Sequence, residues 1–394
     1  MLAVGTNTLP ILCKTDNKKY DAEVVVTNHM PSGSFRGYGY MESTALVSQA
    51  IMEACIKLDI DPVTYLVKNA MKKGDRYHNA NAEPHPWQYN KTADWSDLVV
   101  KTADAFHWSD RFKGWGVPTW VSADGKKVRG VGVGAAGHSD TGGKPSNANV
   151  TLTGLGAVYL STCMSEFGAG TRDVMLKVVA EELDMPLESI RVSDSDTGMT
   201  PPDFGSTGSR STYCGGIVAK RACEDVKKKL YQLAHEKLGL PEDDLEFKGG
   251  YVCRLSNPEE KYSLFPHLMG KVDGVTGCGH FDGVHDSTIF HLQFVEVEVD
   301  LEMGTFKIVD HFGGSDAGVI VNPLPLRNQM QSFFAGIDIA CMEETVWDPN
   351  DYRVLNASNI DYKTRTFNDV VPHDHIVLES MKNTENDYPF GAVG

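Results

Sequence analysis

The sequence predicts an α+β fold of mixed helices and mostly antiparallel sheets, divided into two or more domains. Helix-period and strand-period segments are mixed along the chain, without the strict strand–helix–strand alternation of a parallel sheet. Residues 294–310 alternate apolar and acidic residues around Met303-Gly304, which is typical of an antiparallel hairpin. The length of 394 residues exceeds what one ordinary core organises.

Helical patterns dominate the first part of the chain. Apolar residues recur at helix spacing from Ser43 to Leu58. Asp61-Pro62 has the composition of a cap and first position for a second helix, which we expect to reach Met71. Residues 79–91 are expected to form a surface loop. We assign residues 1–127 to a first domain containing this helical segment, and residues 128–394 to a second.

The second domain is predicted to begin with "VRGVGVGAAG", residues 128–137, in which a strand enters a glycine-rich turn. A hairpin is expected over 150–163, followed by a helix after "EFGAGT" and a strand within "ESIRVSDSDT". The expected buried stripe of that helix consists of Leu176, Val179, Ala180 and Leu183.

A loop of small residues, "PPDFGSTGSRSTYCGG", then leads into a long helix that Gly239 ends. Residues 242–290 are expected to be β-rich, and a helix should run from Asn322-Pro323 to about Cys341. The expected buried face of the long helix consists of Ala219, Cys223, Val226, Leu230 and Leu233. In the hairpin, the residues expected to alternate with acidic ones are Val295, Val297 and Val299.

The composition argues against several classes of partner. A net charge of −16 without a large basic cluster disfavours nucleic acid and anionic membranes. No apolar run reaches the roughly 20 residues of a membrane span, and the amino-terminal residues lack the cationic region of a signal peptide. The eight cysteines occur singly and form no CxxC motif, so iron–sulfur and zinc spacings are missing. We expect reduced, packed thiols in a cytoplasmic protein.

One short stretch, "GSFRGYGYMEST" from Gly33 to Thr44, has the residue types of a ligand-binding loop. Its glycines allow a ligand to approach the backbone closely. Arg36 offers a planar array of donors suited to oxyanions, and Tyr38 offers a flat face to a flat substrate. The alternative is a turn before a helix that carries a surface arginine.

Two further loops open helices and are candidate anion-binding sites. Gly168 to Thr171 precedes one helix, and the hydroxyl-rich segment from Gly205 to Gly216, which includes Arg210, precedes the other. Helix N-termini present N–H groups and the positive end of the helix dipole. Each loop alone is more often plain capping. Two such loops together with Arg36 favour a large, polar ligand that bears phosphate.

Other motifs lack the context that their chemistry requires. Gly132 to Gly137 fits GxGxxG, but "HSDTGG" follows and cannot start a helix, so a nicotinamide-dependent oxidoreductase is disfavoured. His373-Asp374-His375 is expected to form a solvated face, because alternate residues of one strand chelate a metal poorly without a third ligand. No GxSxG or HExxH is present.

Six motifs in order resemble the large subunit of the molybdenum hydroxylases, the family of xanthine dehydrogenase and aldehyde oxidoreductase. They are "FRGYG", "EFGAGTRDVMLKVVAEEL", "DTGMTPPDFGSTGSRSTYCGG", "VEVDLEMGTFKI", "DAGVIVNP" with Gln329 after it, and "PFGAVG". The resemblance runs from about Val24 to Gly394. It implies that 1–127 continues a first molybdenum-binding domain. Residues 128–394 would be a second molybdopterin-binding domain, incomplete at its C-terminus.

The resemblance implies a cofactor and partners. The cofactor would be molybdopterin with molybdenum, in the cytosine dinucleotide form, with no side chain of this chain ligating the metal directly. The reaction would insert water-derived oxygen at an electrophilic carbon of a purine-like N-heterocycle or an aldehyde. Electrons would leave to iron–sulfur clusters and FAD on partner chains or segments. The remaining half of the molybdenum subunit would be a further partner.

The same resemblance assigns roles to residues by motif. Arg36 and Tyr38 would line the substrate side of the molybdenum, and Gln329 would contact the cofactor. Gly37 stands where carbon monoxide dehydrogenases of the family have a cysteine, which favours hydroxylation of a carbon substrate. The residues that would hold the pterin and its phosphates are Phe167, Gly168, Ala169, Gly170, Thr207, Gly208, Ser209, Arg210 and Ser211.

Three departures from the family pattern qualify this assignment, and one is that the first half of the molybdenum subunit, with its Phe-Gly motif near the metal, is not matched in this sequence. Ala169 stands where many members have glutamine, so one hydrogen bond to the pterin would be absent or come from the backbone. The catalytic base of the family, a glutamate, is expected beyond Gly394. We therefore expect this chain to be inactive in isolation. The alternative is a non-catalytic cofactor-fold or assembly subunit that lacks the base.

Overall fold

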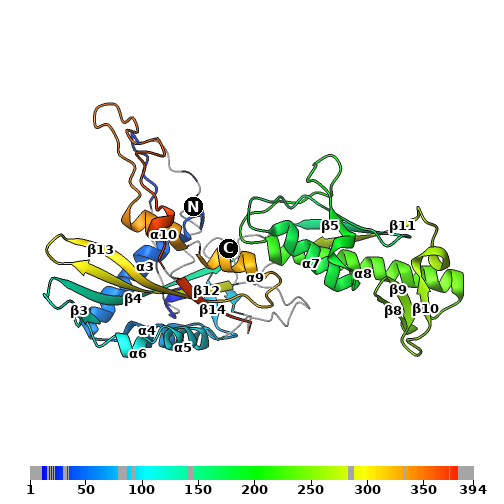
Figure 1. The fold of residues 1–394 in the computed structure, drawn as a ribbon, viewed down its shortest axis with the longest axis horizontal. Coiled ribbons are helices and arrows are strands. Elements are labelled where there is room, and N and C mark those ends of the chain that lie inside the picture. The colour runs from blue at the N-terminus through cyan, green and yellow to red at the C-terminus, as the bar shows by residue number, and fades with distance from the viewer. Residues whose placement is uncertain are drawn as a thin grey trace. The chain divides into compact units, whose positions relative to one another are not determined.

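The chain folds into two compact units, and Figure 1 labels the elements of a computed structural model. Unit 1 comprises residues 1–139, 286–318 and 327–382, and unit 2 comprises 140–285, 319–326 and 383–394. Both units contain helices and mostly antiparallel sheets, so the predicted α+β class is confirmed. The residues that the structure describes are 11–15, 17, 19, 21, 23–29, 33, 35–78, 87–90, 94–139, 145–282, 288–331, 333–371 and 373–379.

Unit 1 is organised by a five-stranded sheet in the order β14-β13-β12-β4-β3. Neighbouring strands are antiparallel except β13 and β14, which are parallel. A separate ribbon pairs β1 (Arg76–His78) with β2 (Trp87–Tyr89). The predicted loop over 79–91 is therefore wrong at β2, and 79–86 and 91 lie outside the described residues. The sheet strands are β3 (Trp120–Val121), β4 (Lys127–Ser139), β12 (Thr288–Asp300), β13 (Thr305–Asp316) and β14 (His373–Leu378).

The glycine-rich motif at 132–137 lies within strand β4, so the turn predicted there is wrong. Gly132 pairs with Val295 and Gly137 with Phe290 on the neighbouring strand β12. Backbone pairing along the whole strand overrides the low strand preference of glycine. A Cβ at Gly137 would overlap the side chain of Ile11, so this position requires glycine. A nicotinamide-binding loop needs a helix here, and the strand takes its place.

Helices α3, α4, α5 and α6 contribute to the core of unit 1, and both helices predicted before residue 75 are confirmed. The carboxylate of Asp61 accepts from the Val63 N–H at 2.8 Å, as expected of a helix cap. Trp95 stacks on Phe290 of the sheet, with ring centroids 5.1 Å apart. The helix bounds are Tyr40–Leu58 for α3, Pro62–Asn69 for α4, Trp95–Ala105 for α5 and Trp108–Arg111 for α6.

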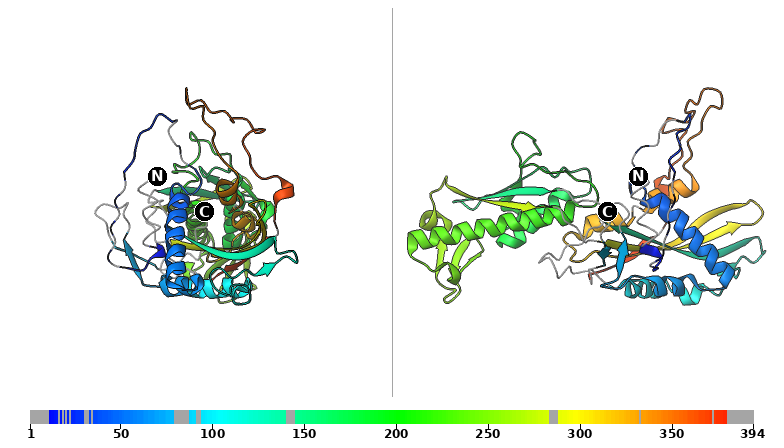
Figure 2. Two further views of the ribbon diagram at one scale, coloured as in Figure 1. Left: turned by 90° about the vertical axis from the view of Figure 1, so that its left-hand side faces the viewer. Right: turned by 180° about the vertical axis from the view of Figure 1, so that it is seen from behind.

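Unit 2 packs two helices, α7 (Thr171–Leu183) and α8 (Ser211–Leu238), with a four-stranded sheet (Figures 1 and 2). A Cβ at Gly277 or Gly279 would overlap the backbone of α8, so these glycines let the helix lie directly on β11. The predicted hairpin over 150–163 is present as β5 and β6. In sheet order the strands are β11 (Gly274–Phe281), β5 (Ser146–Thr153), β6 (Val158–Thr162) and β7 (Ile190–Val192).

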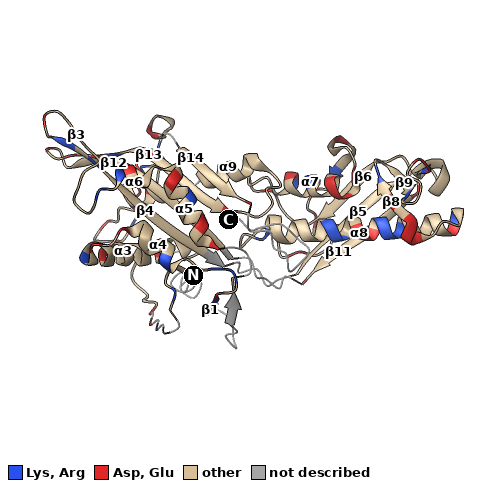
Figure 3. Ribbon diagram, turned by 90° about the horizontal axis from the view of Figure 1, so that it is seen from below, with Lys and Arg blue, Asp and Glu red and all other residues tan. Residues whose placement is uncertain are grey.

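The buried faces of the two helices differ in how well the pattern predicted them. On α8 four of the five expected residues are buried, and Ala234 takes the place of Leu233. On α7 Leu176 and Ala180 are only partly buried. The helix packs against both α8 and β7, so its buried face is rotated about the helix axis relative to the predicted one. The apolar residues that α7 buries are Val174, Met175, Val178, Val179 and Leu183. Figure 3 shows positions of acidic and basic residues interleaved along α8.

The remaining elements are two helices after residue 322 and a set of short strands and helical turns. The helix predicted from Asn322-Pro323 to Cys341 is present as α9 (Pro323–Gln331) and α10 (Phe333–Cys341), with residue 332 outside the described residues. Helix α9 begins in unit 2 and ends in unit 1. The other elements are the strands β8 (Leu245–Lys248), β9 (Tyr251–Arg254) and β10 (Lys261–Ser263), with the helical turns η1 (Leu187–Ser189), η2 (Glu242–Asp244), η3 (Leu264–Leu268) and η4 (Phe367–Asp369).

The predicted hairpin around Met303-Gly304 is confirmed as β12 and β13, joined at 301–304 with Gly304 at φ 66°. At its outer end the three valines of the alternating pattern are only partly buried. The buried residue there is Glu298, which is only 7% exposed and forms ion pairs with Arg129 at 2.8 Å and Lys307 at 3.2 Å. Within the described ranges, none of the helices is both long enough and apolar enough to cross a bilayer.

Candidate functional site

The loop that carries Arg36 is a tight turn in the left-handed backbone region. Gly37, Tyr38 and Gly39 have φ values of 93°, 50° and 100°, and the Tyr38 N–H donates to the Phe35 carbonyl at 2.8 Å. Glycine adopts such angles freely, whereas a tyrosine there costs on the order of 1 kcal/mol. Helix α3 begins directly after Gly39. The turn thus fixes Arg36 and leaves the Tyr38 side chain 50% exposed at the start of a helix.

Arg36 forms a hydrogen bond with Gln329, which lies 293 positions further along the chain. The family resemblance assigns both residues to the region of the cofactor and substrate. The guanidinium NH2 group donates to the Oε1 atom of Gln329 on α9. Desolvation lowers the pKa of Arg36, but a guanidinium remains protonated at any physiological pH. Tertiary structure therefore joins two of the predicted residues, and the hydrogen bond orients the cation.

The loop before α7 is organised by Glu166, a residue that the sequence analysis did not select. The Glu166 carboxylate accepts from the backbone N–H groups of Gly168 at 2.7 Å, Gly170 at 3.0 Å and Arg172 at 3.2 Å. Gly168 and Gly170 have φ values of 102° and 77°, which only glycine adopts without strain. The N-terminal amides expected to bind an external anion are thus engaged by a carboxylate of the chain itself.

The electrostatics of this loop agree with its hydrogen bonds. Burial alone would raise the pKa of Glu166, but the hydrogen bonds from the backbone outweigh it and the pKa is lowered. Phe167 is 67% exposed beside these amides, and Ala169 is partly buried. The hydroxyl of Thr171, the first residue of α7, is buried and has no hydrogen-bond partner among the described residues.

The loop before α8 is built differently. Gly205, Gly208 and Ser209 adopt left-handed angles, with φ values of 92°, 59° and 60°. Within the described part of the chain, the hydroxyls of Thr207, Ser209 and Ser211 take part in no hydrogen bond. The first N–H groups of any α-helix also lack partners within the helix. This loop therefore offers both hydroxyls and amides to a ligand.

The buried side chain of Arg210 supports the α8 loop from the interior of unit 2. Its side chain and that of Asp203 are both fully buried, with 3.7 Å between the guanidinium and the carboxylate. The guanidinium also donates to the Pro145 carbonyl at 3.2 Å and to the hydroxyl of Ser146. Asp203 accepts from the Gly205 N–H at 2.7 Å, which ties the pair to the loop. A phosphate contact by the Arg210 side chain would require this pair to open. Its backbone N–H already donates to the Thr207 carbonyl at 3.3 Å.

The two helix-opening loops are connected in space. The hydroxyl of Ser206 donates to the Ser165 carbonyl at 2.7 Å, which joins the segment before Glu166 to the segment before α8. Unit 2 therefore brings together the two groups of predicted cofactor residues, and unit 1 brings together Arg36 and Gln329.

The histidine motif at 373–375 is not a solvated face throughout. His373 is partly buried and its ring stacks on that of His311, with centroids 4.5 Å apart. Burial lowers the pKa of His311 to about 3 and that of His373 to about 4, so both are neutral at pH 7. The part of the chain that the structure describes holds no group of three or more His, Cys, Asp or Glu suited to bind a metal ion.

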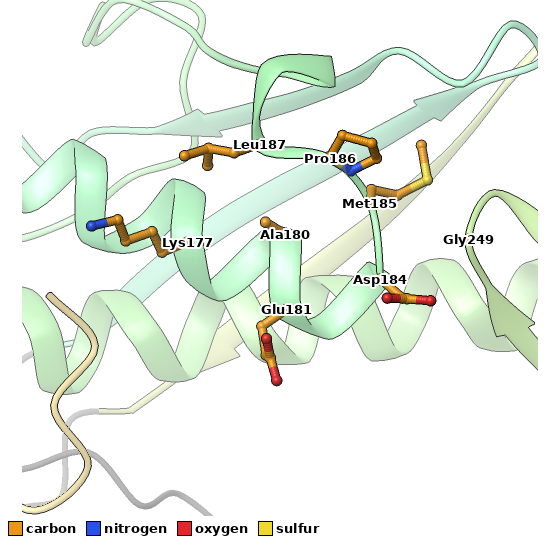
Figure 4. Close-up of a pocket in the computed structure, with 8 residues that line it drawn as sticks. All are labelled: Lys177, Ala180, Glu181, Asp184, Met185, Pro186, Leu187 and Gly249. Atoms are coloured by element: carbon orange, nitrogen blue, oxygen red, sulfur yellow. The ribbon is translucent and has the colours of Figure 1, made fainter.

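An open hollow lies at the other end of α7 (Figure 4). Its lining includes Lys177 and Glu181 of α7, Asp184 directly after that helix, and Gly249 of the turn between β8 and β9. Charged side chains point outward around it, and none of the predicted site residues lines it. The hollow is therefore separate from the two loops that precede α7 and α8.

Comparison with known proteins identifies the family. Residues 101–371 and 3–70 match two molybdopterin cofactor-binding domains. The chain is 27% identical to the 6-hydroxypseudooxynicotine dehydrogenase complex subunit gamma of Paenarthrobacter nicotinovorans, over 95% of this chain and 48% of that protein. It is 25% identical to the putative xanthine dehydrogenase molybdenum-binding subunit of Escherichia coli K12, over 100% of this chain and 52% of that protein.

A solved structure shows the same fold. Reconstituted CO dehydrogenase from Oligotropha carboxidovorans superposes with a TM-score of 0.75 at 18% identity, over 91% of this chain and 46% of that one. The chain thus spans about half the length of the curated relatives it matches. It belongs to the molybdopterin cofactor-binding domain family, in the large-subunit lineage of the molybdenum hydroxylases.

Proposed function

We propose that this chain forms the substrate and cofactor side of a molybdopterin-dependent hydroxylase. The single observation that carries the proposal is the hydrogen bond from Arg36 to Gln329, because it joins two residues that were selected independently by motif. The residues present fit the cofactor: the hydroxyls of Thr207, Ser209 and Ser211 at the start of α8 suit its phosphate end. When bound, the molybdopterin cofactor supplies the oxidation–reduction chemistry of the hydroxylation.

The side chains of this chain would then bind and orient. Arg36 would hold an oxyanion of the substrate, or the negative charge that develops on it, with its guanidinium direction set by Gln329. Tyr38 would present its exposed ring to a planar substrate. The substrate class we propose is an N-heterocycle or an aldehyde. Relatives named for nicotine, hypoxanthine and aldehyde support it, as does Gly37 beside the arginine.

The partners proposed are the remaining half of a molybdenum subunit and chains or segments that carry iron–sulfur clusters and FAD. Relatives named as the gamma subunit of a complex, a large subunit and a large chain support assembly with other chains. The proposed cofactor form is the cytosine dinucleotide, and the proposed location is the cytoplasm. The domain boundary at 127/128 also remains a proposal.

Replacing Arg36 tests the proposed role. In the assembled protein, Arg36→Met should lower kcat/KM by about 30- to 1000-fold, because roughly 2–4 kcal/mol of transition-state stabilisation is lost. Arg36→Lys should recover only part of that, since it keeps the charge and loses the planar fork. The measurement is dye-linked oxidation of a panel of N-heterocycles and aldehydes.

The matched control is Arg353→Met, which removes an exposed arginine that pairs with Asp348 and Asp351 elsewhere in unit 1. Its kcat/KM should stay within about twofold of wild type, since exposed pairs contribute little. Wild-type kcat/KM for Arg36→Met on every accepted substrate would contradict the role given to Arg36.

A further inference from the structure

The two helix-opening loops of unit 2 present different groups to a ligand, although their sequences look equivalent. The α7 loop holds the Glu166 carboxylate against three backbone N–H groups at 2.7–3.2 Å. In the α8 loop, among the residues that the structure describes, the one carboxylate bound to a loop amide is that of Asp203, whose side chain is fully buried and faces Arg210. An anionic ligand would therefore meet a competing carboxylate at α7, and hydroxyls and amides at α8.

We propose that Glu166 is a positioning residue that occupies the anion-binding start of α7 and confines the cofactor phosphate to the α8 loop. This inference rests on the proposed function. By taking the N–H groups of Gly168, Gly170 and Arg172, the carboxylate holds the segment 167–170 in its left-handed glycine conformation. What this loop then presents to a ligand is an exposed aromatic face, Phe167, and carboxylate oxygens that accept hydrogen bonds.

Two contacts on either side of Glu166 hold the α7 loop in place. The Ser206 hydroxyl bonds the Ser165 carbonyl at 2.7 Å, so the residue before Glu166 is attached to the α8 loop. A Cβ at Gly170 would come within 2.9 Å of the Pro325 ring, so the far end of the segment is closed by the start of α9. The loop is fixed at both ends, and Glu166 fixes its middle.

The buried hydroxyl of Thr171 fits the same account. It lies at the first position of α7, only 3% exposed, without a hydrogen-bond partner among the described residues. The N-cap residue of α7 is Gly170, which has no side chain that could cap the helix. The carboxylate of Glu166 supplies the capping oxygens in its place, and the hydroxyl of Thr171 takes no part in capping.

Peptide-resolved hydrogen exchange on the full, assembled protein in its cofactor-free form tests the role of Glu166. Glu166→Ala should speed exchange of the amides in 167–172 by about tenfold or more, because the hydrogen bonds to a charged acceptor are lost. The control is Glu181→Gln, which changes an exposed glutamate within helix α7. It should leave exchange in 167–172 unchanged. Equal exchange in wild type and Glu166→Ala would overturn the proposal.

Inorganic pyrophosphate then shows whether Glu166 excludes an anion from the α7 loop or only stabilises that loop. In the wild type, pyrophosphate should slow exchange in 207–213 and leave 167–172 unaffected. In Glu166→Ala it should slow exchange in both segments, because the α7 amides become available to an external anion. Protection of 167–172 by pyrophosphate in the wild type would overturn the proposal.

The same experiment distinguishes this inference from the proposed function. If pyrophosphate protects 167–172 only in Glu166→Ala and never protects 207–213, Glu166 does exclude anions from α7. The assignment of the phosphate to α8 would then be wrong, and the proposal in its full form would be overturned together with that part of the proposed function.

Discussion

Two helices of unit 2 begin in glycine-rich loops that look alike in sequence, yet their loops are held in opposite ways. The α7 loop is organised from its exposed side by Glu166, which accepts from three backbone N–H groups. The α8 loop is organised from beneath by the buried pair of Arg210 and Asp203, and its hydroxyls remain available. The difference teaches that a helix N-terminus is a candidate anion site only where the chain does not supply its own anion.

The largest effect should follow from breaking the buried support of the α8 loop. Asp203→Ala leaves the Arg210 guanidinium buried without its carboxylate, which we expect to cost about 3–5 kcal/mol in free energy of unfolding. Denaturant unfolding measures this. The matched control near α7 is Asp194→Ala, because Asp194 is fully exposed at 3.5 Å from Arg172 and should cost less than about 0.5 kcal/mol. Equal costs at the two sites would contradict the comparison.

The next effect concerns the ligand that the α8 loop is proposed to hold. Thr207→Glu places a carboxylate among the hydroxyls of that loop and should lower cofactor occupancy about tenfold or more, because like charges close together cost several kcal/mol. Molybdenum and pterin content of the purified assembled protein report the occupancy. Leu155→Glu adds the same charge at an exposed position of unit 2 and should leave occupancy unchanged. Full occupancy in Thr207→Glu would place the phosphate elsewhere.

A pH dependence should distinguish the α7 loop from the α8 loop. The pKa of Glu166 is lowered in the folded protein, so its contribution to loop order is present above its ordinary pKa. The contribution is lost as pH falls through the lowered folded pKa, because the protonated acid accepts more weakly from the amides. Protection factors of the amides in 167–172 should therefore fall in the acid range, and those in 207–213 should fall less. In Glu166→Gln the 167–172 factors should lose this pH dependence. A pH dependence retained in Glu166→Gln would assign the effect to another group.

The smallest effect should come from Thr171. Thr171→Val keeps the shape of the side chain and removes a buried hydroxyl that has no hydrogen-bond partner among the described residues. We expect the free energy of unfolding to stay the same or to rise by up to about 1 kcal/mol. A loss of more than about 1 kcal/mol on thermal or denaturant unfolding would show that the hydroxyl makes a stabilising hydrogen bond.

The elements were predictable where a periodic pattern coincided with a stop signal. The α4 cap at Asp61, the end of α8 at Gly239 and the turn at Gly304 all follow from local chemistry. The pattern did not predict that β4 runs through its glycines, because strand pairing with β12 is a tertiary effect. The buried arc of α7 was misjudged for the same reason, since the packing of α7 on α8 and β7 turns it.

The candidate site, like the fold, was predictable from local signals and not where tertiary contacts decide. Arg36 and Gln329 were selected separately, and only the fold could show that they bind each other. Arg210 was selected as one of the residues of the hydroxyl-rich loop that would hold the cofactor, and only the structure shows that its side chain is buried against Asp203. Glu166 was overlooked, although an acidic residue two positions before Gly168 at the start of a helix is a signal for capping. Side-chain partners across a loop are set by geometry that one sequence does not contain.

The location of the phosphate in the cofactor-loaded, assembled protein tests the central claim most directly. A crystal structure of that complex should show the phosphate against the amides and hydroxyls of 207–211. Glu166 should still accept from Gly168 and Gly170, as it does here. A phosphate bound to the amides of 168–172, with the Glu166 carboxylate displaced into solvent, would contradict the account.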